Sequence, residues 1–204
     1  LDPADPRDAR DGALLCVMFG AALRSSEATT LDWERFGPIN AGGLGWVAFD
    51  KRGIVIELGR SKTSQITPVQ LVIPDRDMPS ARRWLESWIE IARVKPGTPI
   101  FRPISRWGRI EQARIAAESV TDILKSRALD YARAKKMPAH EGQLFAARFT
   151  SHSCRRGYCT SASLAGLSLG EIRKRSRHSS DSVLAKYIED AQGWRYSGLR
   201  GVGV

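Results

Sequence analysis

The sequence is poor in cysteine, and the spacing of its cysteines excludes two common ways of stabilising a small domain. The 204 residues include only Cys16, Cys154 and Cys159, with no Cys-x-x-Cys pair. An odd number without paired spacing argues against a disulfide framework and against a structural zinc site. Cys16 lies in an apolar run and is expected in the core. A reducing compartment, the cytoplasm, is the expected location.

Long hydrophobic runs are also missing. The best candidate, residues 13–23, is shorter than the roughly 20 residues of a transmembrane helix, and Arg24 follows it directly. No secretory signal is visible, and the chain begins at Leu1 rather than at methionine. We therefore expect no membrane partner, and we expect a fragment that begins partway through a longer protein.

Acidic residues are fewer than basic ones. The chain has 32 Lys and Arg against 22 Asp and Glu, which gives a net charge of +10. Such an excess suits a polyanion such as nucleic acid, because Lys and Arg displace the counterions of phosphates. Charge alone leaves two alternatives open, an anionic membrane surface and a basic but otherwise ordinary surface.

Hydrophobic periodicity predicts an α+β fold that is mostly α-helical. Helices are expected at about 10–24, 25–33, 79–92, 113–136, 152–165, 169–176 and 181–191. Short β-branched runs at 45–49, 53–58 and 69–73 predict a small three-stranded antiparallel sheet near the N-terminus. Residues 138–150 are predicted to be connecting chain.

Two basic residues lie at the ends of predicted elements. Arg24 follows the first apolar helix, where it can pair with Glu27 or grip a phosphate with two N–H groups. Lys62 lies at the tip of the predicted hairpin. A lysine there is usually solvated, but a hairpin tip can also reach into DNA and deliver a proton.

His152 and Arg155 begin a predicted helix and share one of its faces. That face continues through small or apolar residues: Cys159, Ala162 and Gly166. Arg155 should therefore point into packed protein, where a guanidinium group needs an anionic partner. A carboxylate such as Glu27 or Glu171 is the structural alternative to a ligand.

His178 follows a basic run, residues 173–177, which is ordinarily a solvated helix end. Ser179 or Ser180 can cap the next helix, so His178 lies in a junction. Tyr187 falls on the apolar stripe of that next helix, where a half-buried core tyrosine is the ordinary interpretation.

Taken together, the order and spacing of these residues are specific. The sequence resembles the tyrosine recombinases, also called lambda-type or phage integrases, from about residue 10 to residue 190. Four segments carry the resemblance: ALRSSEATTLDW, GRSKTSQ, TSHSCRRGYCTSASLAGLSLGEIRKRSRHSS and LAKYIED. One departure is Arg177, where the family usually has glycine. We expect this turn either to be left-handed at a cost or to change.

The resemblance implies cleavage and rejoining of double-stranded DNA through a 3′-phosphotyrosine, with Tyr187 as the nucleophile. Three residues would hold the phosphate: Arg24, Arg155 and His178. His152 would be the general base and Lys62 the general acid. No metal and no other cofactor are expected. Alternatives are relaxation of DNA like that by type IB topoisomerases, and a non-catalytic DNA-binding relative.

The resemblance also implies an organisation. Residues 1–192 would be the catalytic domain and residues 193–204 a tail that can dock on a neighbouring subunit. We expect the N-terminal DNA-clamping domain of the family to be absent from this chain. We expect the full-length protein to form a homotetramer on DNA, associated with the nucleoid, and this fragment to be a monomer.

Overall fold

Seven helices and four strands are defined in the computed structural model, which describes residues 1–35, 45–59, 69–180, 182, 184 and 185. The helices are α1 (Pro6–Gly20), α2 (Ser25–Thr29), α3 (Pro79–Ala92), α4 (Ser119–Ala134), α5 (Ala139–Ala147), α6 (Ser153–Leu164) and α7 (Leu169–Ser176). The strands are β1 (Leu31–Trp33), β2 (Gly45–Asp50), β3 (Gly53–Leu58) and β4 (Val69–Pro74). The chain is thus an α+β protein, as the periodicity predicted.

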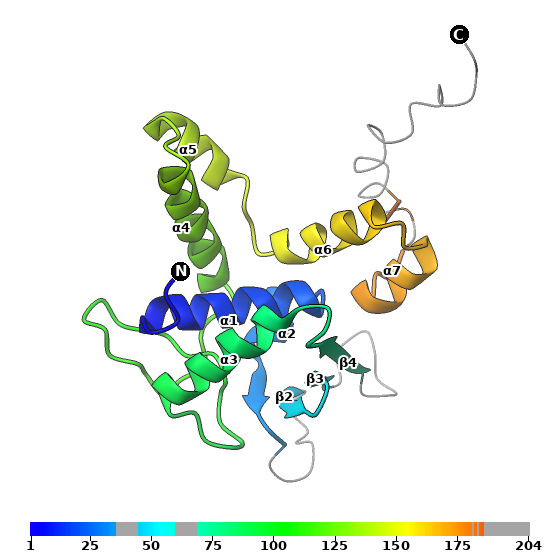
Figure 1. Cartoon of the computed structure of the whole chain (residues 1–204), viewed down its shortest axis with the longest axis horizontal. Coiled ribbons are helices and arrows are strands. Elements are labelled where there is room, and N and C mark those ends of the chain that lie inside the picture. The colour runs from blue at the N-terminus through cyan, green and yellow to red at the C-terminus, as the bar shows by residue number, and fades with distance from the viewer. Residues whose placement is uncertain (36–44, 60–68, 181, 183, 186–204) are drawn as a thin grey trace.

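Helix α1 is the centre of the core. The Asp5 side chain caps it by accepting hydrogen bonds from the backbone nitrogens of Arg7 and Asp8, both at 2.9 Å. Helix α3 packs along it (Figure 1). The contact is close, since a Cβ at Gly12 would come within 2.5 Å of the Trp84 ring. This packing makes α1 a rigid support for whatever its C-terminal end carries.

The sheet has the strand order β1-β2-β3-β4, and one strand differs from the prediction. β2, β3 and β4 form the expected antiparallel meander, whereas β1 pairs in parallel with β2. The predicted helix over 25–33 was therefore wrong beyond Thr29. Leu31 and Trp33 are buried on one side with the half-buried Asp32 between them, which is the period of a strand.

The α4–α5 pair also differs from the prediction. α4 begins at Ser119, later than expected, and α5 occupies a segment predicted to be connecting chain. The two helices pack together and project away from α1 (Figure 1). Phe145 on α5 contacts the rings of Tyr131 and Phe149, with ring centroids 5.8 and 5.3 Å apart.

Helices α6 and α7 lie at the C-terminal end of α1 (Figure 1). A small apolar cluster joins them, made by Cys159, Ala162, Ile172 and Leu184. Of the helix predicted at 181–191, only residues 182, 184 and 185 are described, and they are helical. Within the described ranges, no helix has the length and apolar character needed to cross a membrane.

Candidate active site

The structure describes four of the six predicted site residues: Arg24, His152, Arg155 and His178. Lys62 and Tyr187 lie outside the described residues. The four that are described come from three places: the α1–α2 junction, the start of α6 and the end of α7. Across the described ranges, no group of three or more His, Cys, Asp or Glu residues could hold a metal ion.

Arg155 lies in the first turn of α6 and points into the protein, as its helical face predicted. The residue is only 3% exposed. Its Nη1 donates to the backbone carbonyl of Ala22 at 3.1 Å. Its buried Nη2 has no hydrogen-bond partner among the described residues. An unpaired donor on a buried cation is costly, so this group is suited to an anionic ligand.

The electrostatic surroundings of Arg155 also favour an anion. Burial, followed by the charges of Arg24 and Arg177, lowers the pKa of Arg155 to about 10. That value still leaves the guanidinium charged at neutral pH. An anion bound here would neutralise several positive groups at once.

Glu27 is not the hydrogen-bond partner of Arg155. Its Oε1 accepts from Nη1 of Arg24 at 2.7 Å, and its Oε2 accepts from the Arg24 backbone nitrogen at 2.8 Å. Oε2 also accepts from Nη2 of Arg177 at 2.7 Å. Burial raises the pKa of Glu27, but the two arginines outweigh it and hold that pKa below its ordinary value. The other proposed carboxylate, Glu171, bonds instead to the Ser168 cap of α7.

Arg24 is the exposed member of this group. It occupies the N-cap position of α2, and its side chain remains 42% exposed despite the pair with Glu27. The sequence predicts Arg24 at the end of the first helix, but α1 ends at Gly20. The guanidinium group of Arg24 is therefore partly accessible to solvent, whereas that of Arg155 is buried.

Arg177, which departs from the family pattern and ends the basic run before His178, is a further basic group of the site. It ends α7 in the left-handed conformation, with φ 55° and ψ 39°, so of the two alternatives the left-handed turn is the one present. Its side chain is only 14% exposed. Besides Glu27, it donates to the carbonyls of Ala21 at 3.3 Å and Arg175 at 2.8 Å.

The basic run before His178 is only partly a solvated helix end. Arg175 turns inward and donates to the carbonyl of Gly20 through Nε at 2.8 Å, and to that of Val72 through Nη2 at 2.6 Å. Arg155 and Arg177 bond to the same stretch of chain after α1. The end of a helix has carbonyls without intrahelical partners, and they attract cationic donors. This attraction locates α6 and α7 against α1.

His178 lies beside these arginines and is half-buried. Its Nδ1 is 2.8 Å from the hydroxyl of Ser176, which is fully buried. Burial lowers the pKa of His178 to about 4, with further contributions from Arg155, Arg24, Arg177 and His152 in that order. His178 is therefore neutral at pH 7.

His152 occupies the N-cap position of α6 and is exposed. It lies close enough to His178 to contribute to the lowered pKa of that residue, so the two imidazoles share one electrostatic environment. The fold thus gathers all four described site residues, and Arg177 with them, around one location. An arrangement of this kind can bind a phosphate group and stabilise negative charge that develops on its oxygens.

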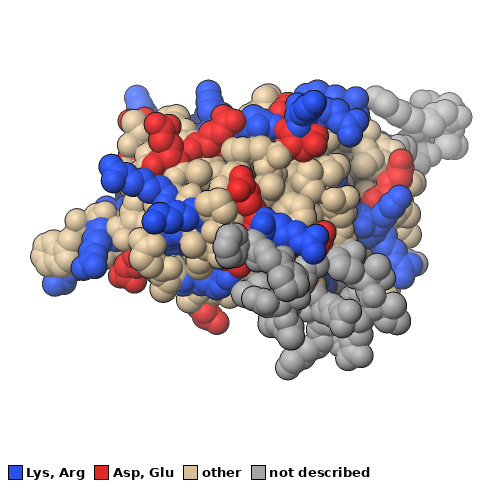
Figure 2. Space-filling model, turned by 90° about the horizontal axis from the view of Figure 1, so that it is seen from below, with Lys and Arg blue, Asp and Glu red and all other residues tan. Residues whose placement is uncertain are grey.

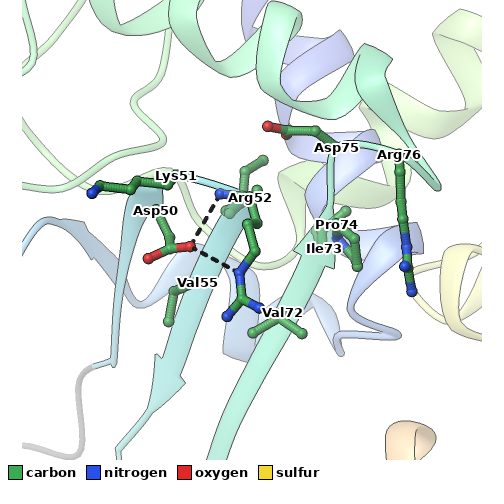
Figure 3. A pocket seen from close by; sticks show the side chains of 11 residues that line it. Asp50, Lys51, Arg52, Val55, Val72, Ile73, Pro74, Asp75 and Arg76 are labelled. Carbon is green, nitrogen blue, oxygen red and sulfur yellow. Dashed lines mark hydrogen bonds and ion pairs between the residues drawn. The ribbon is translucent and has the colours of Figure 1, made fainter.

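Other surfaces are less informative. On the face seen in Figure 2, Lys and Arg side chains are dispersed among acidic and uncharged surface. A hollow lies over the β2–β3 turn and the end of β4 (Figure 3). None of the four described site residues lines it. Its charges pair locally, since Arg52 lies 3.9 Å from Asp50, and Asp75 accepts from Arg82 at 2.7 Å.

Comparison with known proteins identifies the family of the chain. A family model described as the phage integrase family matches residues 1–193. A curated protein of Selenomonas ruminantium, described as an integrase/recombinase XerD homologue, is 28% identical over 193 residues, which are 93% of this chain and 50% of the relative. The chain thus spans about half the length of that relative. Because the family match covers nearly all of the sequence, the chain belongs to the phage integrase family.

Proposed function

We propose that this chain is the catalytic domain of a tyrosine site-specific recombinase, which cuts and rejoins DNA through a covalent bond to Tyr187. The observation that carries the proposal is the buried Nη2 of Arg155, unpaired among the described residues and surrounded by further positive groups. Family membership and the integrase/recombinase description of the relative support it. The substrate would be a phosphodiester of double-stranded DNA.

In this proposal, Arg24 and Arg155 hold the two non-bridging oxygens of the scissile phosphate. The transition state gathers negative charge on these oxygens, and donors fixed in advance stabilise it without reorganising. Arg155 is fixed by its bond to Ala22, and Arg24 by its bond to Glu27. Both donors are therefore held in place before DNA binds.

His178 would be a neutral third donor. Its lowered pKa leaves one proton on the ring at pH 7. If the Ser176 hydroxyl donates to Nδ1, that proton resides on Nε2, which can then donate to a phosphate oxygen. The buried serine would thereby select the tautomer that the site needs.

The bond changes would run as follows. The phenol oxygen of Tyr187 attacks phosphorus in line and passes its proton to His152, while the bond from phosphorus to the 5′ oxygen breaks. Lys62 gives a proton to that oxygen, which leaves as a free 5′ hydroxyl. Tyr187 then carries the 3′ phosphate, and attack by another 5′ hydroxyl reverses these steps and reseals the strand. Cleavage by itself conserves the phosphodiester energy in the phosphotyrosine.

A nicked "suicide" duplex tests this function directly. The short strand released by cleavage diffuses away, so the covalent protein–DNA adduct should accumulate and survive denaturing electrophoresis. An adduct would exclude a purely DNA-binding role. Strand exchange between two duplexes would then distinguish recombination from relaxation. Absence of any adduct with nicked duplexes would count against the proposal.

The organisation of the whole protein is part of the same proposal. The relative is about twice as long as the matched region, which leaves room for a separate DNA-clamping domain in proteins of its length. We propose that residues 193–204, outside the described ranges, form a docking tail, and that the full-length protein assembles as a tetramer on DNA. Deleting the tail from the full-length protein should impair strand exchange more than DNA binding.

A further inference from the structure

The Glu27 carboxylate lies among the basic groups of the site. It is a half-buried carboxylate whose charge opposes the lowering of the Arg155 pKa, yet both of its oxygens are bonded to other residues. If it turned to Arg155 instead, it would occupy the donor that a phosphate needs. The chain therefore requires something that keeps Glu27 in its present orientation.

Arg24 alone cannot supply that constraint. Its side chain is partly exposed, and in the proposed reaction it also contacts the phosphate. Arg177 is different, because it is nearly buried and is tied to the backbone of both Ala21 and Arg175. Its Nη2 therefore reaches Glu27 from a fixed position at 2.7 Å.

We propose that Arg177 is a positioning residue that holds the Glu27 carboxylate away from Arg155 and so leaves the Nη2 of Arg155 open for phosphate. This inference rests on the proposed function, since it names the group that keeps the phosphate site vacant. It also gives a reason for a non-glycine residue in a left-handed turn. That conformation costs roughly 1–2 kcal/mol for a residue with a Cβ, and the bonds made by the guanidinium group offset it.

The inference is tested with inorganic phosphate as the probe and the thermal midpoint of the chain as the readout, at constant ionic strength. Wild type should be stabilised by phosphate with a measurable dissociation constant. Arg177→Ala should weaken phosphate binding by about tenfold or more, because Glu27 then pairs with Arg155 and competes with the anion. Adding Glu27→Gln to Arg177→Ala should restore most of the lost affinity, because the amide is uncharged.

Arg175→Ala is the matched control. Arg175 also anchors the end of α7 to backbone carbonyls, but no hydrogen bond or ion pair to Glu27 is described for it. Its loss should lower the thermal midpoint without phosphate while changing phosphate affinity by less than about threefold. Adding Glu27→Gln to Arg175→Ala should give no gain, so a merely structural effect of the helix end is separable from the effect on Glu27.

The outcomes separate this inference from the function on which it rests. Wild type that binds phosphate, with Arg177→Ala unchanged or with no recovery in the double variant, would overturn the role of Arg177 alone. Wild type that shows no phosphate effect would overturn both, because the anion site itself would be absent. Single-turnover cleavage of the nicked duplex should follow the same order: wild type, then the double variant, then Arg177→Ala.

Discussion

The guanidinium group of Arg155 is held by the backbone carbonyl of Ala22, a residue 133 positions earlier in the chain. A carbonyl fixes the group without neutralising it, whereas a carboxylate would have cancelled its charge. The positive charge thus stays available in a buried place. The same arrangement leaves a desolvated cation with no carboxylate bonded to it among the described residues, which affects both stability and activity.

Replacing Arg155 should separate these two properties. Arg155→Met fills the same space without a buried charge, so we expect the free energy of unfolding to be unchanged or higher by up to about 2 kcal/mol. DNA cleavage should fall by roughly a hundred- to a thousandfold, the usual effect of losing one transition-state donor. Chemical denaturation measures the free energy of unfolding, and single-turnover kinetics measure the rate of DNA cleavage. A loss of stability greater than about 2 kcal/mol would mean that Arg155 is mainly a structural residue.

Tyr187→Phe should abolish the covalent adduct while leaving DNA affinity within a few-fold of wild type. The phenyl ring retains the apolar contacts expected of the stripe but has no nucleophilic oxygen. Denaturing electrophoresis with a labelled nicked duplex gives the readout, and an electrophoretic mobility shift gives the binding control. A persistent adduct would assign the nucleophile elsewhere, with Tyr158 and Tyr196 as the next residues to replace.

The acid and the base can be distinguished by the leaving group. A 5′-bridging phosphorothiolate departs without a proton, so it should restore cleavage by Lys62→Ala to near the wild-type rate on the same DNA. The same substitution should increase cleavage by His152→Ala only slightly, because that variant lacks the base for the attacking tyrosine and not the acid for the leaving group. Cleavage rates on normal and sulfur-containing DNA provide the comparison, and rescue of His152→Ala in place of Lys62→Ala would exchange the two roles.

The DNA-free chain should lose stability as the pH falls from about 6.5 to about 4. The folded pKa of His178, about 4, lies below its ordinary value of 6.5, so the unfolded chain binds the proton more readily in this window. The stability contributed by this shift is complete above pH 6.5 and is lost as the pH falls toward about 4. Screening at a half-buried ring limits the loss to the order of 1 kcal/mol.

The control for this pH effect is His178→Gln, whose stability should change less across the same window, as measured by denaturant unfolding. Saturating phosphate should also raise the pKa of the His178 ring, measured by NMR, because an anion offsets the neighbouring arginines. An identical pH dependence in the variant would assign the effect to other groups, Glu27 among them.

The sequence predicted individual elements better than their pairing. Periodicity located α6 and the inward face of Arg155, because that signal is local and extends over several turns. The strand β1 was missed because three residues show little periodicity, and its pairing with β2 depends on tertiary context. The helix α5 was missed because Gly142 and exposed Leu144 interrupt any clear apolar face.

The contacts within the site, like the pairing of the strands, could not be predicted from the sequence. Order and spacing along the sequence identify the set of Arg24, His152, Arg155 and His178. The contact of Arg177 with Glu27 joins residues 150 positions apart, and no local pattern contains that information. The basic run suggested a solvated helix end, whereas two of its arginines turn inward to reach carbonyls. A sequence does not indicate which backbone carbonyls accept hydrogen bonds from side chains, because every residue has a carbonyl.

The gathering of arginines at the end of α1 also bears on how the protein is made. The bonds from Arg155, Arg175 and Arg177 to that region each span more than 130 residues. Contacts of such long range slow folding, because the chain must close a large loop before it gains from them. On the ribosome, α1 emerges well before α6 and α7. A half-synthesised chain therefore lacks Arg155 and His178 altogether. The capacity to break DNA would arise only after α6 and α7 have packed against the C-terminal end of α1.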